Sequence, residues 1–100
     1  MNDVAITGLG VVSPHGDDPR RMFDALMRGE SVLRPVFPEL AKPAVAAVVA
    51  FDAARWFTKL QLAGVDRVSQ MAVAAADLAV KDAGGHEGLD PSRLGVYVGC

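Results

Sequence analysis

The sequence predicts an α/β fold in which parallel strands pack against helices. Strand-like and helix-like segments alternate in the order strand, helix, irregular stretch, strand, helix, strand. Such alternation is typical of a parallel sheet with helices on its faces. Hydrophobic residues make up 51% of the 100 residues, which argues against a disordered chain. The formal net charge of −2 lacks the basic excess that nucleic-acid binding usually requires.

The composition also limits the cellular compartment that we expect for the protein and the kinds of site that it can contain. Cys100 is the only cysteine, which excludes a disulfide framework and a multi-cysteine zinc centre. No apolar run approaches the roughly 18 residues of a membrane span. The N-terminus lacks the basic head and apolar stretch of a signal peptide. We therefore expect a cytoplasmic protein without a metal, a cofactor or a nucleic-acid partner.

The first half of the chain contains a predicted strand, helix and second strand. Residues 4–6 form a buried-strand run that can extend to residue 12, before Ser-Pro-His-Gly stops it. Asp17 or Asp18 can cap a helix whose first residue is Pro19. An apolar stripe over residues 22–27 supports this helix, and Arg28 and Gly29 end it. Three prolines predict an irregular connection over 30–43, and 44–51 reads as a strand.

The second half centres on a long, alanine-rich helix over residues 65–83. Its polar positions form one narrow stripe (Asp66, Gln70, Asp77 and Lys81), and its other side chains are mostly small and apolar. A helix exposed on one side normally has a wider polar face. The sequence therefore predicts a helix packed on more than one side, deep in a layered structure.

Shorter features surround this helix. Asp52 can cap a helical turn that reaches Trp56 and Phe57, which we interpret as a packing anchor. Gly84 and Gly85 end the long helix, a loop covers 86–93, and residues 94–98 form another strand. The chain stops on this strand without a closing element, so we expect a piece of a larger fold, with no internal domain boundary.

The pair Gly8 and Gly10 after a strand invites a nucleotide-binding interpretation. The dinucleotide fingerprint needs a third glycine, where Ser13 stands, and Pro14 prevents a helix from starting at the loop. A tight strand-to-loop turn is the preferred interpretation.

Other reactive side chains also have simpler interpretations. His15 and His86 lie in predicted loops, far apart in sequence, and make no metal signature. Asp17 and Asp18 fit helix caps better than an acid/base pair. Cys100 follows a strand, but no activating base stands at a recognisable spacing. No catalytic residue is therefore assigned within the chain.

Three segments together resemble the opening of a β-ketoacyl-acyl carrier protein synthase of the elongating condensing-enzyme type. Residues 4–16 read VAITGLGVVSPHG and are similar to the family pattern V-x-x-T-G-x-G-x-x-S-P-x-G. Residues 66–72 (DRVSQMA) and 79–84 (AVKDAG) resemble D-R-F-x-Q-x-A and A-x-x-D-[SA]-G. Residues 93–100 (RLGVYVGC) resemble R-x-G-x-x-x-G-[ST].

This resemblance implies the thiolase-like layered αβαβα fold, with the chain as the opening part of its N-terminal half. It also implies decarboxylative Claisen condensation in fatty-acid or polyketide-like biosynthesis. In that reaction a cysteine carries the acyl group, and malonyl-acyl carrier protein supplies the attacking carbon after losing carbon dioxide. In family members the nucleophilic cysteine lies well beyond the position of residue 100, and two histidines, or a histidine and an asparagine, follow it. Cys100 matches a position beside the acyl-chain pocket, usually serine or threonine.

The resemblance further implies partners. Family members often carry basic residues just before the D-R-x-x-Q helix, where the acidic carrier protein docks. Residues 61–64 read QLAG here, so Lys59 and Arg67 are the nearest cations and are assigned to carrier docking. A homodimer or a synthase heterodimer is expected. Two alternatives remain: a non-catalytic partner subunit of the chain-length-factor type, and a self-sufficient small binding domain.

Overall fold

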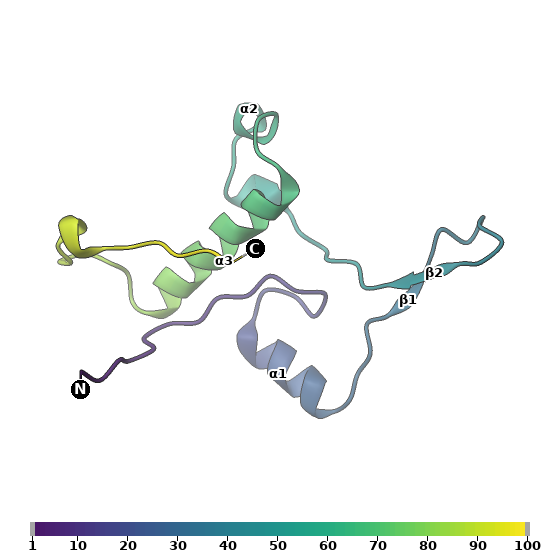
Figure 1. The fold of residues 1–100 in the computed structure, drawn as a ribbon, viewed down its shortest axis with the longest axis horizontal. Helices are drawn as coiled ribbons and strands as arrows, with labels where there is room; N and C mark the ends of the chain where they lie inside the picture. The colour runs from purple at the N-terminus through teal and green to yellow at the C-terminus, as the bar shows by residue number, and fades with distance from the viewer. Residues whose placement is uncertain (1, 100) are drawn as a thin grey trace.

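The computed structural model describes residues 2–99, which form an open arrangement of short elements (Figure 1). The chain extends 56 × 39 × 23 Å along its principal axes. Among these residues no helix combines the length and apolar character that crossing a membrane requires. In chain order the elements are α1 (Pro19–Met27), β1 (Arg34–Val36), β2 (Ala44–Ala46), the 3-10 helix η1 (Ala53–Arg55), α2 (Lys59–Leu62), α3 (Arg67–Asp82) and the 3-10 helix η2 (Pro91–Arg93).

Helix α1 confirms the predicted helix and its caps. The Asp18 carboxylate accepts a hydrogen bond from the Arg20 amide at 2.9 Å, and Pro19 is the first helical residue. Arg28 is the C-cap, and Gly29 follows with a φ of 69°, a conformation that glycine adopts without strain. Of the two aspartates considered as the cap, Asp18 therefore has that role.

Helix α3 confirms the predicted long helix within two residues at its start and one at its end. Asp66 caps it by accepting from the Ser69 amide at 2.7 Å, and Gly84 follows the C-cap with a φ of 90°. Gln70, expected in the polar stripe, is buried instead, and its amide donates to the Val65 carbonyl at 2.8 Å. A buried amide needs such a partner.

The sheet differs from the predicted parallel arrangement. β1 and β2 form a two-stranded antiparallel hairpin, with Pro35 opposite Val45. β1 lies inside the stretch predicted to be irregular, and β2 is shorter than the predicted strand over 44–51. Proline is tolerated because both strands of a two-stranded sheet are edge strands.

The strands predicted over 4–6 and 94–98 are also wrong for the described chain, since neither belongs to a β-ladder. Residues 7–8 and 94–96 line the two sides of a groove of about 390 Å³ over the C-terminal part of α3. The two segments therefore approach the same helix, but their backbones do not come close enough to pair with each other.

The N-terminal segment packs its backbone directly against α3 at Gly8 and Gly10. A Cβ atom on Gly8 would lie 2.7 Å from the Ala83 nitrogen, and one on Gly10 would overlap the Ala75 carbonyl oxygen. The Leu9 amide between them donates to the Asp82 carboxylate at 2.9 Å. Close approach to the helix, and not a strand-to-loop turn, therefore explains both glycines, whereas the turn itself follows at residues 13–16.

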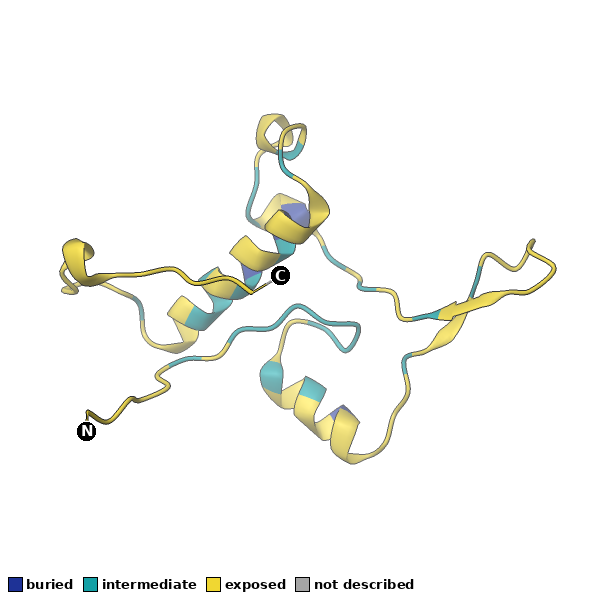
Figure 2. Cartoon of the chain, viewed as in Figure 1, coloured by how far each residue is buried: buried dark blue, intermediate teal, exposed yellow. Residues whose placement is uncertain are grey.

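Burial is sparse across the described residues (Figure 2). The buried residues are Ala25, Ala53, Ala74 and Gln70, all at most 9% exposed. On α3, Val68 remains 72% exposed. Within residues 2–99 the N-terminal segment contacts α3 along Ala75, Ala79 and Ala83, and Trp56, directly after η1, contacts it at Asp77 on a different side of the helix. The expected covering on more than one side is therefore present in part.

A Gly10→Ala substitution is expected to lower the free energy of unfolding of the intact protein by about 1–3 kcal/mol, because the new methyl group overlaps the α3 backbone. Thermal or denaturant melting measures this change. Gly64→Ala is the matched control: the nearest atom to its added Cβ is 4.0 Å away, and the substitution should stabilise by up to about 1 kcal/mol. Equal effects of the two substitutions would contradict the close packing on α3.

Residues 1–100 expressed alone are expected to self-associate and to bind a hydrophobic dye. Large apolar side chains project into solvent at both ends of the chain, with Val4 91% and Tyr97 97% exposed. Light scattering, dye fluorescence and calorimetry measure these properties. A monodisperse monomer with one sharp, cooperative melting transition would instead support a self-sufficient small domain.

Candidate functional site

The two cations assigned from the sequence lie at one corner of the molecule, formed by residues 51–67 and hereafter called the η1–α3 corner. Lys59 is the first residue of α2, Arg67 is the first residue of α3, and both are exposed. Figure 1 shows α2 projecting beyond the N-terminal end of α3. The corner is therefore accessible, and its cations face outward from two helix starts.

A capping box builds helix α2. The Thr58 hydroxyl accepts from the Gln61 amide at 3.3 Å, and the Gln61 side chain accepts from the Thr58 amide at 2.8 Å. The sequence interpretation missed this short helix, although the Thr-x-x-Gln spacing is a recognised signal for a helix start. The reciprocal bonds fix Lys59 at the outer end of the corner.

Stacked side chains form the inner part of the η1–α3 corner. The Phe51 and Trp56 rings stack with centroids 5.6 Å apart and planes 19° from parallel. The Arg67 guanidinium lies 4.8 Å from the Phe51 ring centroid and donates to the Phe51 carbonyl at 3.4 Å. The Arg55 guanidinium lies 4.5 Å from the Trp56 ring. Each arginine thus lies over an aromatic ring, whose face attracts the positive charge of the guanidinium.

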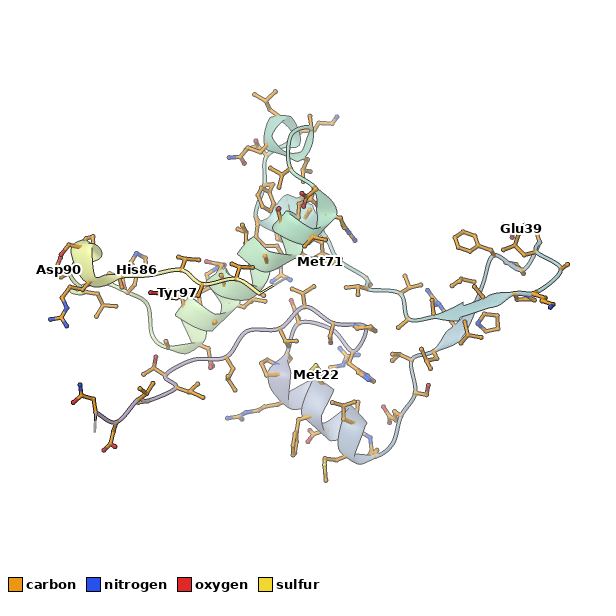
Figure 3. All side chains as sticks on the ribbon, in the orientation of Figure 1. Met22, Glu39, Met71, His86, Asp90 and Tyr97 are labelled. Carbon is orange, nitrogen blue, oxygen red and sulfur yellow. The ribbon has the colours of Figure 1, made fainter. Side chains whose placement is uncertain are left out.

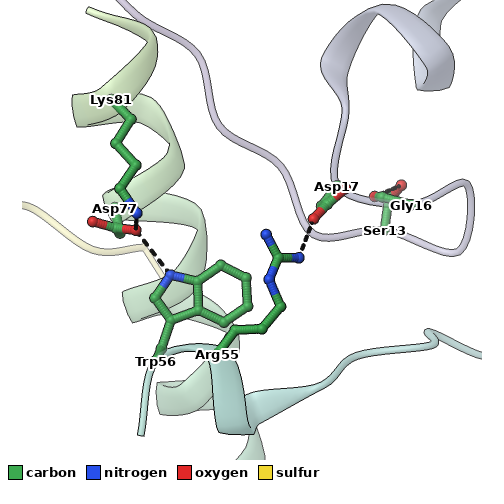
Figure 4. A network of polar contacts seen from close by, with 7 residues as sticks. All are labelled: Ser13, Gly16, Asp17, Arg55, Trp56, Asp77 and Lys81. Atoms are coloured by element: carbon green, nitrogen blue, oxygen red, sulfur yellow. Dashed lines mark hydrogen bonds and ion pairs between the residues drawn. The ribbon is translucent and has the colours of Figure 1, made fainter. Parts of the chain in front are cut away.

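Trp56 is anchored to α3 through a carboxylate (Figure 4). Its indole nitrogen donates to Asp77 Oδ2 at 2.9 Å, and Lys81 Nζ lies 2.6 Å from the same oxygen. The Lys81 ammonium and, next, the Trp56 indole lower the pKa of the Asp77 carboxyl. The sequence predicted the pair of Asp77 with Lys81 and the packing role of Trp56, and both are confirmed.

A second ion pair ties the corner to the N-terminal segment. Arg55 Nη1 lies 2.6 Å from Asp17 Oδ2, and this hydrogen bond lowers the pKa of the Asp17 carboxyl. Asp17 follows a turn closed by two hydrogen bonds between the Ser13 and Gly16 backbones. Because Asp17 pairs with Arg55 and Asp18 caps α1, the two carboxylates do not form an acid/base pair. No sequence pattern signals a contact between residues so far apart.

The remaining candidate residues do not join this corner. His15 lines a cavity of about 460 Å³ beside α1. His86, which Figure 3 labels, lines the groove beside the end of α3. Among residues 2–99 no group of three histidine, cysteine or acidic side chains is placed to hold a metal ion. Cys100 lies outside the described residues.

The chemistry available at the η1–α3 corner is binding. Its two carboxylates, Asp52 and Asp66, are both occupied as helix caps, each accepting a backbone hydrogen bond. Arg55 pairs with Asp17, so Lys59 and Arg67 are the cations of the corner that make no ion pair within residues 2–99. The corner can therefore attract an acidic partner, and its groups form no nucleophile and base pair.

Comparisons with known proteins identify the family. The chain matches the family described as "Beta-ketoacyl synthase, N-terminal domain" over residues 1–100. It is 39% identical, over 96% of its length, to the granaticin polyketide putative β-ketoacyl synthase 1 of Streptomyces violaceoruber, and covers 24% of that protein. It therefore spans about a quarter of the length of this curated relative. No solved structure matches the chain.

Both subunits of one polyketide synthase are also similar to the chain. The tetracenomycin polyketide synthase ketoacyl synthase β subunit of Streptomyces glaucescens is 35% identical over 94% of the chain, which covers 23% of that subunit. The α subunit of the same synthase is 33% identical over 96% of the chain, which covers 24% of it. On these matches, which include the family's N-terminal domain over residues 1–100, the chain belongs to the β-ketoacyl synthase family.

Proposed function

We propose that this chain is the N-terminal part of a polyketide β-ketoacyl synthase that extends acyl chains. The match of all 100 residues to the family's N-terminal domain carries this proposal. In the proposed reaction a cysteine thiolate beyond residue 100 holds the acyl group as a thioester. Malonyl-acyl carrier protein loses carbon dioxide, and the resulting carbanion equivalent attacks the acyl carbonyl. The acyl–sulfur bond then breaks, the thiolate is released, and the lengthened chain remains on the carrier.

We also propose that the chain takes its place in the layered thiolase-like fold, as one piece without an internal boundary. Two observations support this: the small side chains of α3 admit a neighbouring backbone at Gly8 and Gly10, and the α3 side chains Val68 and Val73 remain exposed among residues 2–99. The rest of the synthase then covers these side chains. Cys100 is assigned to the edge of the acyl-chain pocket in this arrangement, and the synthase to the cytoplasm.

A second candidate function is a non-catalytic partner subunit. The similarity to the tetracenomycin β subunit, 35%, is nearly the same as that to the α subunit, 33%, so identity over this segment favours neither role. The partner subunit would act in a heterodimer with a catalytic copy, whereas the catalytic role fits either a homodimer or a heterodimer.

The carrier protein is proposed to dock at the η1–α3 corner through Lys59 and Arg67. Both side chains are exposed, and the carboxylates beside them are occupied by helix caps. An acidic carrier surface would meet these cations without displacing an internal ion pair of either residue within the described chain. Such contacts steer association and depend on salt.

The catalytic proposal predicts that the full-length protein forms an acyl-cysteine and releases carbon dioxide from malonyl-acyl carrier protein. Mass spectrometry of the acylated peptide and trapping of labelled carbon dioxide measure the two steps. Residues 1–100 alone are the control and should show neither. A full-length protein that is inert alone, yet restores activity to a separate catalytic subunit, would support the partner-subunit role.

The docking proposal predicts that Lys59→Glu and Arg67→Glu each raise KM for the carrier protein, with little change in kcat. A severalfold rise at low salt is expected, shrinking as ionic strength increases. Lys42→Glu is the matched control, because it makes the same charge change in the connection between β1 and β2, away from α2 (Figure 1). An equal rise in KM for all three variants would contradict docking at the corner.

A further inference from the structure

We propose that Phe51 is a positioning residue that holds the Arg67 guanidinium ready for the carrier protein. The inference rests on the proposed docking role of the η1–α3 corner. Two contacts carry it: the guanidinium lies 4.8 Å from the Phe51 ring centroid, and its Nη2 donates to the Phe51 carbonyl at 3.4 Å. One residue thus contacts Arg67 through both its ring and its backbone.

These contacts matter because a free arginine side chain is flexible. Ordering a long side chain on binding costs conformational entropy, and a side chain that is already held loses less of it. A guanidinium carries five N–H donors. The Phe51 carbonyl engages one nitrogen, so donors on the others remain for a carboxylate or phosphate of the carrier.

Phe51 is itself fixed to the helix that Arg67 begins. Its ring stacks on Trp56 at 5.6 Å, and the Trp56 indole donates to Asp77 on α3 at 2.9 Å. A continuous series of contacts therefore runs from Arg67, the first residue of α3, through the Phe51 and Trp56 rings and back to α3 at Asp77. A segment tied to the helix at two places keeps the Phe51 ring under the guanidinium.

This arrangement distinguishes the two proposed docking cations. Within residues 2–99, Lys59 makes no ion pair and stacks on no aromatic ring. Its contribution should depend on charge alone, so Lys59→Arg should retain affinity. Arg67 should depend on shape as well as charge, because an ammonium does not reproduce a planar, stacked guanidinium.

A double-mutant cycle in the full-length protein tests the proposal. The variants are Phe51→Leu, Phe51→Tyr, Arg67→Ala and the pair Phe51→Leu with Arg67→Ala. Calorimetric titration gives the Kd for the malonyl-loaded carrier, steady-state kinetics gives KM and kcat where the protein is active, and melting monitors folding. Phe51→Leu should weaken carrier binding about two- to fivefold. Phe51→Tyr should stay close to the unmodified protein, and Phe51→Leu should add nothing once Arg67 is alanine.

The outcomes separate this inference from the docking proposal. If Arg67→Ala leaves the Kd unchanged, docking through Arg67 fails. If Arg67→Ala weakens binding while Phe51→Leu does not, or if the two effects simply add, the positioning role is overturned. Should Phe51→Leu fail to fold, Phe51→Met replaces it in the cycle, because it keeps an apolar side chain without an aromatic ring: a weaker Kd that disappears in the Arg67→Ala background supports positioning, and an unchanged Kd overturns it.

Discussion

The structure depends on the direct contact between the N-terminal backbone and helix α3. Glycines at positions 8 and 10 and alanines at 75, 79 and 83 meet with no side chain longer than a methyl group between them. The Leu9 amide completes the contact by donating to Asp82. Because the described chain buries few large side chains, this contact and the ties around Trp56 hold the segments together. Within residues 2–99, packing of backbone against small residues thus joins the N-terminal segment to α3.

Local features were predictable from the sequence because local chemistry determines them. The caps at Asp18 and Asp52 and the glycines after α1 and α3 need only neighbouring residues, and the structure confirms them. The strands over 4–6 and 94–98 were not predictable in this way. A strand forms only where its backbone pairs with another strand, and the sequence of one segment does not show whether such a partner lies beside it. The antiparallel hairpin was missed because the prolines of residues 30–43 argued against a strand, although a short edge strand tolerates proline.

The candidate site shows the same contrast between features that the sequence predicts and contacts that only the structure reveals. The sequence pointed to Lys59 and Arg67, and the structure places both at one exposed corner. The side chains that organise this corner come from distant parts of the chain: Asp17 reaches Arg55, Phe51 supports Arg67, and Asp77 holds Trp56. No periodicity or motif encodes such contacts. A charged residue can therefore be located from sequence, while what orders it must be seen in three dimensions.

The position of Trp56 gives the corner an optical property. It is the only tryptophan among the 100 residues, and its indole ring touches an aromatic ring, a guanidinium and a carboxylate at once. Indole emission responds to the polarity and charge of its surroundings. The natural fluorophore of this segment therefore sits where the connection before α2 meets α3, and its emission reports whether that junction is intact.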